Sequence, residues 1–98
     1  MTRDEIISKI QNSADEIKAE GATALYLFGS RLRGDNDPDS DVDLFIEYDK
    51  GQSFSLMELV GIQHIIEDIL DIDVDVTTRD SLHPLLKKDI EAEAMRIF

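Results

Sequence analysis

The fold of this chain is most strongly constrained by two short segments in which apolar residues alternate with mostly acidic ones. One long segment with an apolar face separates them. Successive side chains of a β-strand point to opposite faces. Each alternating segment, DVDLFIEY (41–48) and IDVDVTT (72–78), is therefore predicted to be a strand with one face on a core. The core positions are Val42, Leu44 and Ile46 in the first segment and Ile72, Val74 and Val76 in the second. Such strands, alternating with helices, predict a sheet with helices packed on it.

The first part of the chain adds a helix and another strand. A capping-box pattern at the N-terminus predicts a helix over residues 3–20, ended by Gly21. The glycine-bounded segment ATALYLF (22–28) is short, apolar and rich in strand-forming residues, so it is predicted to be a buried strand.

The second part of the chain continues the alternation. A second capping box predicts a helix over 56–70 with a wide apolar face, and a last helix is predicted to begin between Ser81 and Pro84 and to end near Ala94. The final MRIF fits either a helix end or a short strand. We therefore predict a single domain over residues 1–98, of the α/β (α+β) class.

The chain is strongly acidic, with 22 Asp and Glu against 10 Lys and Arg and a formal net charge of −12. This charge argues against direct binding of nucleic acid, because such proteins neutralise phosphates with clustered basic residues. It suits a metal ion, a basic protein partner or a nucleotide presented as its magnesium complex. A solvated surface with no partner would explain the same charge.

Cysteine is absent, which excludes disulfides, thiolate metal sites and cysteine nucleophiles. The sequence has no long apolar run and no apolar segment preceded by basic residues at its start, so neither a membrane helix nor a secretory signal is expected. We expect a cytoplasmic protein with no membrane association.

Two carboxylates on the 41–48 strand are candidate metal ligands. Asp41 and Asp43 flank one residue, so both project from the same strand face, roughly 6.5–7 Å apart along the backbone. Fixed anions this close repel each other, a cost that a divalent cation removes, and oxygen ligands suit Mg²⁺ or Mn²⁺. A third carboxylate from the 72–78 strand, either Asp73 or Asp75, would complete a site for two metal ions.

The turn before this strand has features of a phosphate site. Gly29 permits close approach of the backbone, and the hydroxyl of Ser30 with the adjacent amides can donate to phosphate oxygens. If residues 30–34 form a helical turn, its dipole adds to this attraction. Arg31 and Arg33 are candidate phosphate contacts, although arginines in an acidic loop often just balance local charge.

The acidic stretch between these features has a plainer interpretation. Asp35, Asn36, Asp37 and Asp39 are predicted to form an ordinary turn. A calcium loop is excluded, because its sixth position is Ser40 instead of glycine and its twelfth is Ile46 instead of glutamate.

The spacing G-S-x10-D-x-D at a strand–loop–strand junction resembles the signature of the DNA polymerase β-like nucleotidyltransferase superfamily. Nearly the whole chain is similar to the superfamily's shortest members, the minimal nucleotidyltransferase (MNT) proteins encoded beside HEPN-domain toxins. The likeness is carried by LYLFGSRLRGD, DSDVDLFIE and VDVTTRDSLHPLL. It implies the minimal nucleotidyltransferase fold, a small mixed sheet packed with helices.

The resemblance also implies roles for individual residues. Asp41 and Asp43 would ligate two Mg²⁺ ions, with Mn²⁺ as the alternative, and Asp75 would complete the catalytic ion and help deprotonate the acceptor. Asp73 stays open as the rival third carboxylate. The triphosphate of ATP would lie against Gly29 and Ser30.

The implied reaction is transfer of AMP from ATP to a hydroxyl, with release of pyrophosphate. MNT antitoxins as a class modify a tyrosine of the HEPN ribonuclease toxin in this way, so a HEPN-domain toxin is the expected partner. Two alternatives stay open. One is an antitoxin that neutralises its toxin by binding alone, and the other is a subunit that acts on a small molecule with the help of a separate substrate-binding chain.

Overall fold

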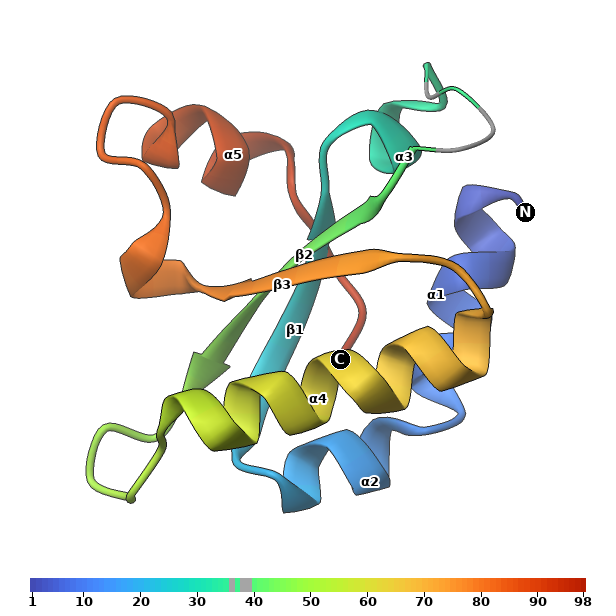
Figure 1. Cartoon of the computed structure of the whole chain (residues 1–98). Helices are drawn as coiled ribbons and strands as arrows, with labels where there is room; N and C mark the ends of the chain where they lie inside the picture. Colours follow the sequence, from blue (N-terminus) through green and yellow to red (C-terminus); the bar gives the residue numbers. More distant parts are fainter. Residues whose placement is uncertain (36, 38–39) are drawn as a thin grey trace.

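The structure, a computed structural model, describes residues 1–35, 37 and 40–98 of the chain. The predicted turn at Asp35, Asn36, Asp37 and Asp39 therefore lies partly outside the described residues. The elements are, in order, α1 (Arg3–Gln11), α2 (Ala14–Ala19), β1 (Ala22–Phe28), α3 (Ser30–Arg33), β2 (Val42–Tyr48), α4 (Leu56–Leu70), β3 (Val74–Thr78), the 3-10 turn η1 (Arg79–Ser81), α5 (Lys87–Glu93) and β4 (Met95–Arg96) (Figure 1).

The strands form one mixed sheet in the order β3-β2-β1-β4. β1 pairs antiparallel with β2 and with β4, while β2 and β3 run parallel and are connected through α4. A parallel pair needs such a crossover, because a short turn can join only antiparallel strands. The predicted α+β class and mixed sheet are confirmed.

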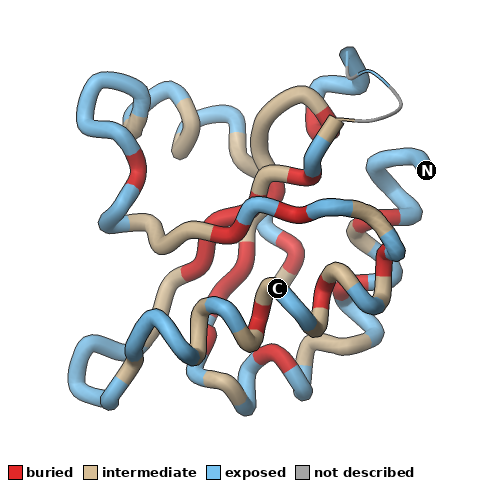
Figure 2. Tube along the Cα trace, in the orientation of Figure 1, coloured by how far each residue is buried: buried red, intermediate tan, exposed pale blue. Residues whose placement is uncertain are grey.

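The core lies between the sheet and the grouped helices α1, α2 and α4 (Figures 1 and 2). All three predicted core positions of β2 are fully buried, and Val74 and Val76 of β3 are nearly so. Buried isoleucines of the helices complete this cluster: Ile6, Ile10, Ile17, Ile62 and Ile66. Both predicted capping boxes are present, at the starts of α1 and α4.

Two helix boundaries differ from the prediction. The helix expected over 3–20 is interrupted at Asn12 and Ser13, two residues of low helix propensity, where the amide of Ser13 donates to the carbonyl of Ile10 (3.0 Å) in a tighter turn. The last helix begins at Lys87, later than expected, and is preceded by a turn in which the carbonyl of His83 accepts from the amides of Leu86 and Lys87 (2.9 Å each). The ambiguous MRIF includes a short strand, β4.

The sheet face opposite this core, here called the outer face, carries a small aromatic cluster. Phe45 points to this face, yet it is fully buried, because Tyr26 stacks on it at 4.7 Å between ring centroids and Phe28 packs at 5.7 Å. The guanidinium carbon of Arg79 lies 5.7 Å from the Phe45 ring centroid. Arg79 therefore helps to cover the aromatic rings.

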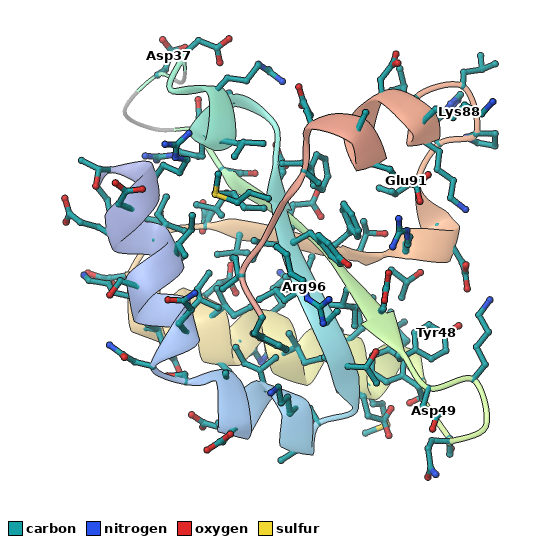
Figure 3. The ribbon with its side chains drawn as sticks, turned by 180° about the vertical axis from the view of Figure 1, so that it is seen from behind. Asp37, Tyr48, Asp49, Lys88, Glu91 and Arg96 are labelled. Atoms are coloured by element: carbon teal, nitrogen blue, oxygen red, sulfur yellow. The ribbon has the colours of Figure 1, made fainter. Side chains whose placement is uncertain are left out.

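Ion pairs attach α5 to the outer face. No residue of α5 is buried, and Glu91 of this helix pairs with Arg79, which also pairs with Glu47 of β2. In Figure 3, Glu91 lies on the side of α5 nearest the sheet and Lys88 on its outer side. The hydrogen bonds that Arg79 donates to the carboxylates of Glu91 and Glu47 raise the pKa of Arg79, so this cation stays charged at any ordinary pH.

We expect Arg79→Met to lower the free energy of unfolding by about 1–2 kcal/mol, because it removes two ion pairs and a cation–π contact. Urea denaturation measures this loss. Lys50→Met is the matched control, since it removes one exposed ion pair, with Asp80, and should leave the midpoint unchanged. Equal midpoints for the two variants would contradict the role given to Arg79.

Candidate active site

One row of side chains crosses the outer face and brings two predicted site residues together. Phe28 of β1 pairs with Asp43 of β2, and Asp43 pairs with Asp75 of β3. Paired residues of neighbouring strands project from the same face with Cβ atoms about 4.5–5.5 Å apart. The Asp43 and Asp75 carboxylates are therefore neighbours, although 32 positions separate them in the sequence.

Asp43 is the residue of this row whose ionised form is destabilised by its surroundings. Its pKa is raised, first by partial burial and then by the negative charges of Asp75 and Asp41, while Arg33 acts in the opposite direction. Asp41, which directly precedes β2, is exposed. The three predicted carboxylates thus interact through their charges, and Asp43 is the member that burial affects most.

The structure separates Asp75 from its rival Asp73. The carbonyl of Asp73 accepts from the amide of Val42 (3.2 Å), which places Asp73 one row away from Asp43. Asp73 also lines a shallow depression with Glu67, Asp71 and Ile72. Strand register, which periodicity within one strand cannot reveal, therefore favours Asp75 as the carboxylate beside Asp43.

Gly29 lies directly against Asp43. A Cβ atom on Gly29 would stand 2.4 Å from Oδ2 of Asp43, closer than real Cβ contacts allow. Gly29 also has φ 80° and ψ −160°, a backbone conformation that essentially only glycine adopts. Only glycine at this position therefore lets the turn pack on the Asp43 carboxylate.

The predicted helical turn after Gly29 is present as α3. The carbonyl of Gly29 accepts from the amides of Leu32 (3.1 Å) and Arg33 (3.2 Å), and the carbonyl of Ser30 accepts from Gly34 (2.8 Å). Ser30 is the first residue of α3 and is partly exposed. The backbone of Ser30 is thus held beside the carboxylate row.

Arg31 is directed into the loop that follows α3. It is 6% exposed, and its guanidinium donates to the carbonyl of Ser40 through Nε (3.1 Å) and Nη2 (2.8 Å). These bonds hold Ser40, the residue just before Asp41, against α3. The geometry gives Arg31 a positioning role, and its contact with phosphate stays a prediction.

Arg33 remains near the carboxylates. Its guanidinium pairs with Asp35 (3.2 Å) and with Glu93 of α5 (3.0 Å), and its positive charge acts on Asp43. Sequence reasoning did not identify Glu93, because only the packing of α5 brings it to this loop. A phosphate contact by Arg33 would compete with these two carboxylates.

The carboxylate row fits a hard divalent cation by its chemistry. Its donors are all oxygen, and their mutual repulsion at Asp43 is relieved by a bound cation. Within the described part of the chain, no three His, Cys, Asp or Glu side chains are close enough to enclose a metal ion by themselves. Mg²⁺ commonly takes its remaining ligands from water and substrate phosphate, so this donor set suits a metal bound together with a nucleotide.

A deeper cavity lies elsewhere on the protein. It has a volume of about 290 Å³ near the end of β2 and contains none of the predicted site residues. Its lining residues are Thr23, Ile46, Glu47, Tyr48, Lys50, Arg79 and Asp80. The cavity and the row of carboxylates therefore lie at different places. We assign the candidate active site to the carboxylates, because the cations of the cavity, Arg79 and Lys50, are already paired with carboxylates.

Residues 7–97 match the sequence profile of the nucleotidyltransferase domain. The chain is 38% identical over 77 residues to a Methanocaldococcus jannaschii protein provisionally named a protein adenylyltransferase, covering 79% of this chain and 81% of that one. It is 26% identical to the protein adenylyltransferase MntA of Thermococcus cleftensis, over 99% of this chain and 97% of that one. No helix among the described residues is long and apolar enough to cross a membrane.

Solved structures share the fold. A minimal nucleotidyltransferase superposes with a TM-score of 0.82 at 25% identity, covering 97% of this chain and 95% of that one. A toxin–antitoxin complex with AMP-PNP superposes with a TM-score of 0.69 at 19% identity, covering 90% of this chain and 72% of that one. With the sequence match over almost its full length, the chain belongs to the nucleotidyltransferase domain family and is a transferase of that family.

Proposed function

We propose that the protein is an antitoxin that transfers AMP from ATP to a tyrosine hydroxyl of a partner HEPN-domain toxin and releases pyrophosphate. The names of its relatives support adenylyl transfer to protein. A Shewanella oneidensis MNT antitoxin of the same fold was solved in complex with a tri-AMPylated HEPN toxin, with a TM-score of 0.62 at 16% identity over 90% of this chain and 68% of that one. The acidic surface suits such a partner if the toxin carries a basic, RNA-binding face.

The observation that carries this proposal is the contact between Gly29 and the row of Asp43 and Asp75. It places a backbone turn able to hold phosphate directly beside paired carboxylates on a rigid sheet. In the proposed assignment, Gly29 and Ser30 hold the triphosphate, and Asp41, Asp43 and Asp75 hold Mg²⁺. When bound, Mg²⁺ supplies positive charge that screens the carboxylates and the triphosphate from each other.

In this proposal, Asp75 is the residue that acts on the acceptor. It is exposed and lies on the side of Asp43 away from Gly29, so an acceptor hydroxyl can approach it without crossing the nucleotide. In the proposed reaction Asp75 accepts the hydroxyl proton while the tyrosine oxygen bonds to the α-phosphorus of ATP. The bond from that phosphorus to the β-phosphate bridging oxygen breaks, and its electron pair leaves with pyrophosphate.

Matched variants can show which of Asp73 and Asp75 takes part in the reaction. We expect Asp75→Asn to lower the rate of AMP transfer by about two to four orders of magnitude, the usual contribution of a positioned base. Asp73→Asn makes the same chemical change directly before the same strand and, at saturating partner, should keep a rate within about threefold of wild type, since Asp73 does not lie beside Asp43. Single-turnover rates measure both, and a larger loss for Asp73→Asn would reverse the assignment.

Co-expression with a HEPN-domain toxin tests the proposed function. Wild-type protein should restore growth, and mass spectrometry of the purified toxin should find AMP on a tyrosine. Asp43→Asn should bind the toxin without modifying it. Tight neutralisation of a toxin that carries no AMP would replace the proposal with the sequestering antitoxin, and AMP found only on a small molecule would favour the subunit alternative.

A further inference from the structure

β3 is an outer strand of the sheet, and one of its edges pairs with no other strand of the described chain. It hydrogen-bonds only with β2 in the sheet order, and Figure 1 shows it drawn in front of that strand. The carbonyl of Asp73 points toward β2, where it accepts from Val42. Because backbone groups alternate in direction along a strand, those of Val74, Val76 and Thr78 point away from the sheet.

Most of these outward groups take no hydrogen bond from any residue that the structure describes. The amide of Val74 donates to Oε2 of Glu67 (3.3 Å), which closes the beginning of the edge. Within the described residues, no hydrogen bond engages the carbonyl of Val74, either backbone group of Val76 or the amide of Thr78. Four neighbouring backbone groups are thus free to pair with another strand.

We propose that the acceptor protein docks by adding an extended segment to this edge of β3, with its hydroxyl residue opposite Asp75. This inference rests on the proposed transfer of AMP to a protein. A strand added at the usual spacing of about 4.8 Å would continue the row of Phe28, Asp43 and Asp75 by one position. The acceptor side chain would then project from the outer face directly beside the Asp75 carboxylate.

The charge of the edge indicates which segment fits. Asp73 and Asp75 project from alternate positions of this strand, and a depression of about 320 Å³ at its start is lined by Glu67, Asp71, Ile72 and Asp73. An added segment with arginine or lysine two residues from the hydroxyl residue would place that cation opposite Asp73. The opposite edge strand, β4, has two residues and offers a shorter template.

N-methylated peptides test the pairing itself. The probe is a nine-residue peptide with a central tyrosine, arginines two residues to either side, and valine or threonine at the other positions. One derivative is N-methylated at the tyrosine and every second residue from it, and the other at the intervening residues. In an added strand only one of these sets faces β3, so we expect one derivative to accept AMP at least about tenfold more slowly than the other.

Equal rates for the two derivatives would overturn the edge-docking inference. So would a probe peptide that stays unlabelled while a HEPN toxin in the same assay is labelled, and in that case the proposed function would stand. If neither the peptide nor the toxin is labelled, the proposed function fails and the inference fails with it.

A pair of variants tests the edge with the intact partner. Thr78→Pro removes an outward amide at the last residue of β3, where the backbone needs to shift from a φ of −90° toward proline's φ of about −65°. Thr78→Ala keeps the amide while losing the same hydroxyl bond to Ser81. We expect Thr78→Pro to label the toxin about tenfold more slowly than Thr78→Ala, with equal binding of MgATP by the two variants. Equal labelling rates would contradict docking along β3.

Discussion

Replacing Asp43 with asparagine is expected to lower AMP transfer by about a thousandfold. The variant keeps the volume of the side chain but removes the charge at the centre of the carboxylate row, and metal-assisted charge stabilisation is worth several kcal/mol. Because Asp43 also lies against Gly29, its loss affects the carboxylates and the phosphate turn together. Single-turnover labelling at saturating ATP measures the change, and a rate within tenfold of wild type would contradict the assignment.

The same variant is expected to be more stable than wild type in the absence of Mg²⁺. Burial and the charges of Asp75 and Asp41 raise the pKa of Asp43 above its unfolded value, so its ionised form destabilises the folded state. This loss of stability is complete at pH values above the pKa of Asp43 in the folded protein. It shrinks as the pH falls through that pKa and is absent below the pKa of Asp43 in the unfolded chain. Thermal melts of metal-free protein should therefore find Asp43→Asn more stable at neutral pH, with the difference shrinking in acid.

Addition of Mg²⁺ provides the control for this stability difference. A cation bound by the row should raise the melting temperature of the wild type and leave that of Asp43→Asn nearly unchanged. A wild type that is equally stable with and without Mg²⁺ and ATP would argue that the carboxylates bind no metal.

Gly29→Ala is expected to lower AMP transfer by about a hundredfold, the effect of displacing a catalytic group by about 1 Å. The new Cβ would stand 2.4 Å from Oδ2 of Asp43, so either the turn or the carboxylate must move. Gly34→Ala is the matched control. Gly34 also has φ 80°, yet a Cβ there meets nothing within 4 Å.

A comparison of the two glycine variants distinguishes the effect of backbone strain from the effect of disturbing the contact with Asp43. Gly34→Ala should cost about 1 kcal/mol of stability and leave transfer close to wild type. Transfer rates and urea midpoints measured together distinguish the two effects. If both variants lose activity in proportion to their lost stability, the close contact between Gly29 and Asp43 has no special role.

Local chemistry explains why much of the fold could be predicted. The alternation of side chains in 41–48 and 72–78 predicts strands, and β2 and β3 form there in the folded protein. The capping boxes at Thr2 and Ser55 were predictable because all their hydrogen bonds lie within one helical turn. The helix expected over 3–20 is interrupted at Asn12 and Ser13, because apolar periodicity continues across this break and so does not reveal it.

The candidate site was predictable only in part. The spacing of Gly29, Asp41 and Asp43 is local, so the sequence already places them on one strand–loop–strand unit. The choice between Asp73 and Asp75 depends on the register between β2 and β3, and the engagement of Arg33 by Glu93 depends on where α5 packs. Neither relation leaves a periodic or compositional signal.

Labelled ATP shows whether the protein transfers a nucleotide to a HEPN-domain partner at this site. Purified protein, partner and Mg²⁺ are incubated with ATP labelled at the α-phosphate or, separately, at the γ-phosphate. The proposed function predicts that the partner acquires label from the α-phosphate alone and that Asp43→Asn abolishes it. Label from the γ-phosphate, or α-label that persists undiminished in Asp43→Asn, would contradict nucleotidyl transfer at this site.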